Sequence, residues 1–169
     1  IYAGNSAPKY TMGWRNTFSW KGLSLSFLFN ARVGGVGVSM TQALMDNYGT
    51  SQASADARDA GGVIINGSKV PAVQKWYQTS SSAGSQYVYS MTNVRLAELS
   101  LGYDVPIQKW VKWMKGLNVA FTGRNLFMLY CKSPFDPELA ASTGTHFDGM
   151  DYFMLPSTRN LGFSVKLKF

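Results

Sequence analysis

The sequence predicts an all-β fold in which five antiparallel strands form part of a large β-barrel that crosses a membrane. Three observations predict it. Apolar and polar residues alternate with period two in five segments, as they do in a strand with one apolar and one polar face. The connections between these segments are alternately short and long. Aromatic residues make up 14% of the 169 residues, and several tryptophans lie near segment ends, where a membrane interface favours them.

The first two segments predict a hairpin. In residues 10–20, Trp14 and Phe18 share an apolar face, and residues 23–32 repeat the alternation. Between them stands Lys21-Gly22, a dipeptide that is typical of a tight turn. The two segments should therefore pair directly.

Three further segments follow, at residues 91–104, 117–130 and 158–169. The alternation is clearest in the last of them, and it is lost at Leu126–Tyr130, where apolar residues are continuous. Either a β-bulge, which adds a residue to one strand and shifts the register, or a buried rim would explain that loss.

The long connections should be mostly irregular. Residues 33–90 are predicted to hold one short helix, because Ser39 and Gln42 form a capping-box pair and Leu44 and Tyr48 continue an apolar stripe. Residues 79–85 are rich in Ser and Gly and are expected to be loop. The short connection 106–116 is expected to be helical.

Alternation alone fits either a soluble sandwich or a membrane barrel, since both have one apolar and one polar strand face. Strands of about ten residues suit a tilted crossing of a bilayer. Short and long connections alternate in outer-membrane barrels too. Because five strands cannot close, and open edges are not viable in lipid, we expect the chain to be the C-terminal part of a larger barrel.

Composition excludes several classes of protein. No apolar run reaches the roughly 18 residues of a transmembrane helix. One Cys and one His exclude a disulfide framework and a Cys/His zinc site within the chain. The net charge is +7, but there is no dense basic run or zinc-finger spacing, so no nucleic-acid partner is expected. A first residue other than Met indicates a processed chain or a piece of a longer one.

Several short motifs occur in a fixed order. They are Gly4–Thr11 followed by Gly13-Trp14 and Asn16–Phe18, Val94–Leu96 with Leu99–Tyr103 and Pro106, Gly123–Phe127, Asp136–Glu138, and Gly162–Phe169. Together they resemble the C-terminal barrel region of SusC/RagA-type TonB-dependent outer-membrane transporters. Cys131 and the Ser-Pro-Phe before Asp136 depart from the family pattern, which often has Gly-Tyr there.

The resemblance implies a 22-stranded barrel in the outer membrane of a Gram-negative bacterium, with these strands as its last five. It implies an N-terminal plug domain, contact with TonB through that region, and import driven by the proton gradient. The implied partners are a SusD-like surface lipoprotein and outer-membrane lipid, and the implied cargo is oligosaccharides or oligopeptides. Long loops would be extracellular, and short turns and the C-terminus periplasmic. A passive porin and a soluble carbohydrate-binding sandwich remain as alternatives.

Four groups of residues are candidates for functional roles. Each group shares a residue type and a place in the predicted fold. They are the lumen-facing basic residues Arg15, Arg32, Arg124 and Arg159; the ligand or partner contacts Tyr48, Trp76, Tyr77 and Tyr87; the membrane-interface anchors Lys109, Trp110, Lys112 and Trp113; and, by resemblance, the barrel-assembly signal Phe163, Val165, Leu167 and Phe169.

No enzymatic activity is predicted, and no cofactor is required. Asp136, Glu138, Asp148 and Asp151 could hold Ca²⁺ in an extracellular loop, but their spacing favours carboxylates that structure the loop. Cys131 and His146 could form a nucleophile and base. A single Cys at a strand end and a single loop His are seldom such a pair.

Overall fold

The computed structural model describes residues 3–107, 111, 113–139 and 148–168. The chain divides into two compact units. The sheet unit comprises residues 8–34, 92–132 and 157–169, and the loop unit comprises residues 1–7, 35–91 and 133–156. The two units are built in different ways and are described separately.

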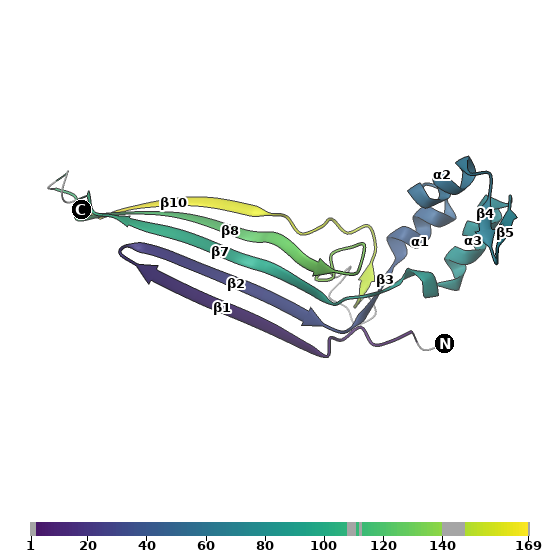
Figure 1. Cartoon of the computed structure of the whole chain (residues 1–169), viewed down its shortest axis with the longest axis horizontal. Helices are drawn as coiled ribbons and strands as arrows, with labels where there is room; N and C mark the ends of the chain where they lie inside the picture. Colours follow the sequence, from purple (N-terminus) through teal and green to yellow (C-terminus); the bar gives the residue numbers. More distant parts are fainter. Residues whose placement is uncertain (1–2, 108–110, 112, 140–147, 169) are drawn as a thin grey trace. The chain divides into compact units, whose positions relative to one another are not determined.

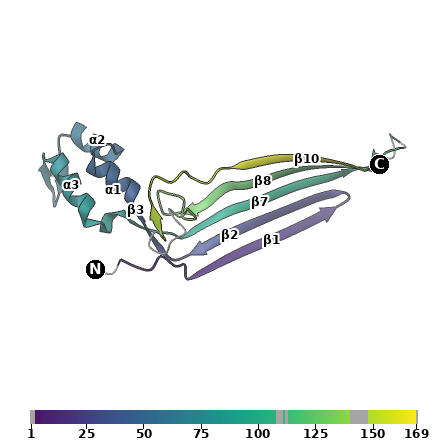
Figure 2. The same cartoon turned by 180° about the vertical axis from the view of Figure 1, so that it is seen from behind.

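The sheet unit is one antiparallel sheet, drawn as five long arrows in Figure 1. Its strands lie side by side in the order β1 (Tyr10–Trp20), β2 (Leu23–Val33), β7 (Asn93–Val105), β8 (Gly116–Cys131) and β10 (Asn160–Lys168). Figure 2 shows the same order from behind. The bounds lie within two residues of the predicted strands, because alternation marks the strands directly.

A two-residue turn joins β1 and β2. Lys21 has φ 45° and Gly22 has φ 87°, the pair of positive values that a tight hairpin turn of this twist needs. Trp20 pairs with Leu23 on either side of the turn, and Tyr10 pairs with Val33 at the far end. The predicted hairpin is confirmed over its whole length.

The predicted loss of alternation in β8 is a bulge. Glu98 pairs with Arg124 and Leu96 pairs with Phe127, so Ala97 faces two residues of β8, Asn125 and Leu126. Asn125 adopts φ 51°, a left-handed conformation that Asn tolerates better than most residues. A second shift lies between Val94 and Arg95. Beyond these shifts the two faces of the sheet continue in a new register.

In its described residues the loop unit contains three helices and two small sheets. The helices are α1 (Met40–Asn47), α2 (Gln52–Asp59) and α3 (Val73–Ala83), with a 3₁₀ turn η1 (Ser85–Tyr87). One sheet has the order β6 (Val88–Ser90), β3 (Val36–Ser39), β9 (Met150–Asp151), and the other is the hairpin of β4 (Val63–Ile65) and β5 (Ser68–Val70). None of these short strands was predicted.

The prediction of a single helix is wrong. Helix α1 is the predicted one, and the Ser39 hydroxyl accepts a hydrogen bond from Gln42 N at 3.2 Å. Helix α2 has the same kind of cap, since Ser51 Oγ accepts from Ser54 N at 3.1 Å. Its sequence, QASADARD, lacks an apolar stripe, so periodicity does not mark it. Helix α3 extends through residues predicted to be loop and ends at Gly84, whose φ is 70°.

Among the described residues, the loop unit buries large side chains in a core of its own. Tyr87 and Met91 are almost completely buried there, and a Cβ on Gly37 would lie 2.5 Å from Met91 Sδ. In the sheet unit large aromatic residues are exposed instead, with Trp14 59% and Phe163 69% accessible. Among the described residues, no helix is both long and apolar enough to cross a membrane. Residues 108–110 and 112 of the connection 106–116, which was expected to be helical, lie outside the described residues.

Candidate functional site

Strand register sorts the sheet side chains into two faces. The aromatic face contains the row Phe18, Leu25, Leu101, Phe121 and Phe163, one residue from each strand. The polar face contains the next row, Thr17, Ser26, Ser100, Thr122 and Gly162. Successive residues of a strand point to opposite faces, so the predicted division into two faces extends across all five strands.

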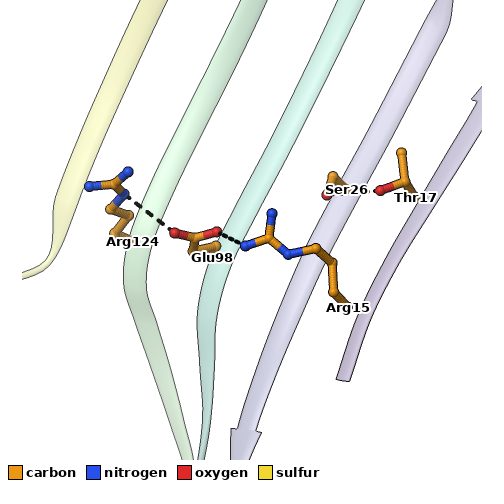
Figure 3. Close-up of polar contacts among 5 residues, drawn as sticks. All are labelled: Arg15, Thr17, Ser26, Glu98 and Arg124. Carbon is orange, nitrogen blue, oxygen red and sulfur yellow. Dashed lines mark hydrogen bonds and ion pairs between the residues drawn. The ribbon is translucent and has the colours of Figure 1, made fainter. Parts of the chain in front are cut away.

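A charged row crosses the polar face. Arg15, Leu28, Glu98, Arg124 and Asn160 are successive cross-strand partners. Figure 3 shows the Glu98 carboxylate between the two guanidinium groups. Arg15 Nη2 donates to Glu98 Oε2 at 2.6 Å, and Arg124 Nε lies 3.7 Å from Glu98 Oε1. One carboxylate thus binds arginines from both sides and leaves a net positive charge on this row.

Beside this row lies a row of hydroxyl groups. Thr17 Oγ1 donates to Ser26 Oγ at 3.2 Å (Figure 3). Gly162 keeps the row shallow, because a Cβ there would lie 2.8 Å from Thr122 Oγ1. Hydroxyl, amide and guanidinium groups can hydrogen-bond water or a polar solute. The polar face is therefore suited to a wet surface.

The end of the sheet nearest the Lys21-Gly22 turn is basic. Lys115, Lys166 and Lys168 line a depression of about 680 Å³, together with Asp104 and Asn118. Asn118 Nδ2 donates to Asp104 Oδ1 at 2.7 Å. Lys166 and Lys168 are exposed on β10, so they are accessible to anionic groups at this end of the sheet.

The aromatic face contains a cluster of ring contacts. Trp14 lies 5.5 Å from Phe27 and 5.8 Å from Phe29, measured between ring centroids, and Phe27 lies 5.4 Å from Phe29. Such contacts stabilise pairs of strands. They do not remove the rings from solvent, and this face remains the largest run of exposed apolar side chains in the sheet unit.

The four predicted basic residues do not form one group. Arg15 and Arg124 share Glu98, and Arg32 lies on the polar face opposite Asn93. Arg159 differs. Its guanidinium lies 5.4 Å from the centre of the Phe127 ring, and Phe127 is in register with Leu96 and Phe29 of the aromatic face. Arg159 thus covers an aromatic ring by a cation–π contact at the end of that face.

The loop unit contains a separate pocket of about 260 Å³. It is lined by the end of α1 (Asp46, Tyr48), by α2 (Ser54, Arg58) and by the start of α3 (Gln74, Tyr77). Arg58 Nη1 donates to Gly49 O at 2.9 Å, which holds the guanidinium at the end of α1. One acidic and one basic side chain therefore line the same small space.

Asp46 is 4% exposed and accepts a hydrogen bond from a tyrosine hydroxyl. Tyr87 OH donates to Asp46 Oδ2 at 2.8 Å. Burial, and then this hydrogen bond, raise the pKa of Tyr87 to about 12. Burial also raises the pKa of Tyr77, and the charges of Asp46 and Asp56 raise it further. Both phenols therefore remain protonated donors at neutral pH.

The structure separates the four predicted aromatic contacts. Tyr48, 76% exposed, and Tyr77 line the pocket. Tyr87 is 2% exposed, so its predicted role as a ligand or partner contact is wrong: its ring packs in the core and its hydroxyl binds Asp46. Trp76 lies on α3, partly exposed, and does not line this pocket.

The loop carboxylates form structural hydrogen bonds. Asp136 Oδ1 accepts from Glu138 N at 3.1 Å, Asp148 Oδ2 from Ser6 Oγ at 2.7 Å, and Asp151 Oδ2 from Ser39 Oγ at 2.9 Å. Within residues 3–107, 111, 113–139 and 148–168, no three His, Cys, Asp or Glu side chains gather as metal ligands would. Asp136 thus binds a backbone N–H of its own loop, whereas Asp148 and Asp151 bind serine hydroxyl groups of distant segments of the same unit.

Several predicted residues lie outside the described residues. They are the anchors Lys109, Trp110 and Lys112, the terminal Phe169, and His146, the candidate base for Cys131. Trp113 is described and is 67% exposed. Cys131 is the last residue of β8 and is half-buried.

The chain is similar in sequence to two TonB-dependent receptors. The chain is 28% identical over 175 residues to TonB-dependent receptor P3 of Formosa agariphila, covering 98% of this chain and 17% of that protein. It is 27% identical over 143 residues to TonB-dependent receptor P26 of the same organism, covering 82% and 14%. The chain thus spans about a sixth of the curated relatives that it matches. No family model matches.

Solved structures match over nearly the whole chain. The RagAB peptide importer in the "closed-closed" state superposes with a TM-score of 0.74 at 21% identity, covering 99% of this chain and 18% of that one. The "open-open" state gives a TM-score of 0.70 at 20% identity, covering 98% and 18%. The similarities support a segment of a SusC/RagA-type TonB-dependent receptor.

Sequence reasoning missed the loop pocket. Asp46 and Arg58 lie on different helices and are not part of a recognisable motif. Only Tyr48 and Tyr77 were selected, as aromatic residues in a long connection. A signal did exist for α2, because Ser51 is a good N-cap residue, but only the fold brings Asp46 and Arg58 together.

Proposed function

We propose that the chain forms part of the wall and external loops of an energised outer-membrane importer in a Gram-negative bacterium. The cargo would be oligosaccharides or oligopeptides, taken up together with a SusD-like surface lipoprotein. One observation carries the proposal: the sheet has an exposed aromatic face and an opposite charged and hydroxyl-rich face, each continuous over five strands. The similarity of this unit to a receptor barrel supports it.

In this proposal the aromatic face meets lipid and the polar face lines the lumen. A water-exposed face with Trp14, Phe18 and Phe163 more than half accessible would be a large apolar patch and an aggregation hazard. Lipid removes that cost. The Arg15–Glu98–Arg124 row, by contrast, would be expensive in hydrocarbon and is inexpensive beside water.

The sheet edges are the second support. Strands β1 and β10 are the outer strands, and an outer strand leaves half of its backbone N–H and C=O groups without a ladder partner from this sheet. In a membrane these groups require neighbouring strands. We therefore assign both edges to the rest of one closed barrel, 22-stranded by resemblance, which would also hold a plug domain and reach TonB through its N-terminal region.

The two ends of the sheet suggest its orientation. Both long connections leave the end opposite the Lys21-Gly22 turn. In outer-membrane barrels long loops are extracellular and short turns periplasmic. The basic depression and Trp113 would then lie near periplasmic lipid headgroups, where ammonium groups and indole rings are favourable. Phe163, Val165 and Leu167, on the aromatic face of β10, would belong to the segment read during barrel assembly.

Cysteine accessibility in the full-length receptor tests the two faces. In a Cys131→Ser background, Phe163→Cys should react with a lipid-soluble maleimide and be protected from a charged one. Ser164→Cys, the next residue on the same strand, is the matched control and should react with the charged reagent. Equal labelling of both positions by the charged reagent would contradict the lipid assignment.

Uptake distinguishes an importer from the alternatives. Cells that express the full-length receptor with its lipoprotein should accumulate labelled oligosaccharide or oligopeptide, and a protonophore should abolish accumulation. Equilibration that a protonophore does not affect would instead indicate a passive porin. A folded monomer of residues 1–169 in buffer without detergent would favour a soluble sandwich.

A further inference from the structure

The pocket of the loop unit contains a buried hydrogen-bond acceptor that no described residue satisfies. Asp46 lines the pocket and is 4% exposed. Its Oδ2 accepts from Tyr87, while Oδ1 has no hydrogen-bond partner among the described residues. A buried carboxylate oxygen without a donor is unfavourable. A ligand hydroxyl or N–H that reaches Asp46 would remove that cost.

The same pocket offers donors on its other walls. Arg58 Nη1 is held by Gly49 O and by Ser54 Oγ, at 2.9 and 3.4 Å, which fixes the planar guanidinium and leaves its other nitrogens for a ligand. Helix α3 begins at the pocket with no side-chain cap at Ala72 and no acidic residue in its first turn. Val73 N already donates to Pro71 O at 2.8 Å, so the helix start adds donor capacity at Gln74, the next residue of the pocket wall.

Two tyrosines provide flat apolar surfaces beside these polar groups. Tyr48 is 76% exposed, and Tyr77 is partly buried with its hydroxyl donating to Ala53 O at 3.1 Å. The Tyr77 ring is thereby fixed, whereas the Tyr48 ring stands free at the pocket rim. Aromatic faces of this kind pack against the apolar C–H surfaces of a sugar ring.

We propose that this pocket binds one neutral sugar unit of an oligosaccharide. Adjacent hydroxyl groups of a sugar ring can donate to Asp46 and accept from Arg58 at the same time. A peptide ammonium group would gain from Asp46 but would lie close to the Arg58 charge. The volume of about 260 Å³ is just below the usual range for drug-sized ligands, which suits a single ring. The inference rests on the proposed import function and names a ligand class for it.

Binding to the purified full-length receptor in detergent tests the proposal. The probes are the neutral hexasaccharides of glucose, xylose and mannose, with tetra-alanine as the peptide probe, each measured by titration calorimetry. Asp46→Asn keeps a carbonyl oxygen for Tyr87 and replaces the second acceptor by a donor. We expect at least one hexasaccharide to bind about 10- to 100-fold more weakly, since a hydrogen bond to a charged group is lost.

Two further variants keep the test decisive if Asp46→Asn perturbs the fold. Tyr48→Ala removes an exposed ring and should also weaken hexasaccharide binding about tenfold. Tyr152→Ala removes an exposed tyrosine of the same unit outside the pocket and should leave affinity unchanged.

The proposal is overturned by three results: no hexasaccharide binds, binding is equal in all variants, or tetra-alanine binding is what Asp46→Asn removes. Protonophore-sensitive uptake is measured separately. If uptake is protonophore-sensitive but the calorimetry gives one of these three results, the sugar pocket is excluded and the import function still stands.

Discussion

The two units of the chain differ in where they place large apolar side chains: the loop unit buries several of them, and the sheet unit exposes them on one face. The loop unit buries Tyr87 and Met91 and fixes its helices with caps such as Ser39 and Ser51. The sheet unit leaves Trp14 and Phe163 accessible and uses strand pairing over five strands. The loop unit thus places large side chains in a core, whereas the large apolar side chains of the sheet lie on an accessible face, as they would in the lipid-facing wall proposed above.

This comparison predicts where substitutions should be costly. On the sheet, cost should depend on which face is changed. In the loop unit, cost should depend on burial and hydrogen bonding, as in a soluble domain. The predictions below test these two rules in the full-length receptor.

The largest effect is expected for Leu101→Arg on the aromatic face. If the residue lies near the bilayer midplane, a charge there should destabilise the barrel by about 2–4 kcal/mol. Ser100→Arg, the neighbour on the polar face, is the matched control and should cost little. The measurement is reversible unfolding in lipid vesicles, followed by tryptophan fluorescence. Equal costs for the two variants would contradict the assignment of the faces.

Tyr87→Phe should produce the next largest effect, confined to the loop unit. The change removes the donor to Asp46 Oδ2 and leaves the buried carboxylate without that hydrogen bond, at a cost of about 1–3 kcal/mol. Hydrogen exchange should accelerate in α1 and α3 while the strands stay protected. Tyr152→Phe, at an exposed position of the same unit, should change nothing. Faster exchange in the strands as well would mean that the units unfold together.

Asn125 tests the bulge that interrupts the regular sheet. Its φ of 51° should make Asn125→Val cost about 1–2 kcal/mol, because a β-branched residue is strained in the left-handed region. Asn125→Gly also loses the weak 3.4 Å hydrogen bond to Thr158 O but removes the strain, so it should be nearly neutral. Thermal unfolding of the receptor measures both. A Gly variant as unstable as the Val variant would assign the cost to the hydrogen bond.

The same bulge shows how far the sequence predicts this molecule. The continuous apolar run Leu126–Tyr130 indicated a bulge or a buried rim, but not that Gly123 allows the bulge. A Cβ on Gly123 would lie 2.7 Å from Leu126 Cδ2, and Leu126 is one of the few buried side chains of the sheet. Each residue of the motif 123–126 thus has a structural role. Gly123 leaves space for Leu126, which is buried, Arg124 places a charge on the polar face, and Asn125 adopts the left-handed conformation.

The loop unit was harder to predict for a related reason. Alternation arises where one side of a strand meets a uniform surrounding, and the strands were located by it almost to the residue. Helices α2 and α3 pack against short neighbouring elements instead of one uniform surface. Their sequences therefore do not show a regular pattern of apolar residues. Asp46 and Arg58 line one pocket from two different helices. Only the fold brings them near each other, and their spacing in the sequence does not indicate it.

The smallest effect is expected at Glu98, where the carboxylate binds Arg15 and Arg124. The side chains of all three are more than one third exposed in this chain. Water and salt screen such pairs, so a double-mutant cycle of Arg15→Gln and Glu98→Gln should give a coupling of about 0.2–1 kcal/mol that weakens as salt is added. Thr17→Ala with Glu98→Gln is the control cycle and should give no coupling, since Thr17 bonds to Ser26 instead.

The coupling between Arg15 and Glu98 reports on the surroundings of the polar face in the assembled receptor. A lumen wall in contact with water should keep the small, salt-sensitive value, whereas a coupling above about 2 kcal/mol that salt does not change would require the carboxylate to be desolvated. That result would mean that another part of the receptor covers this row, and that the charged row serves to dock that part rather than to line a wet passage.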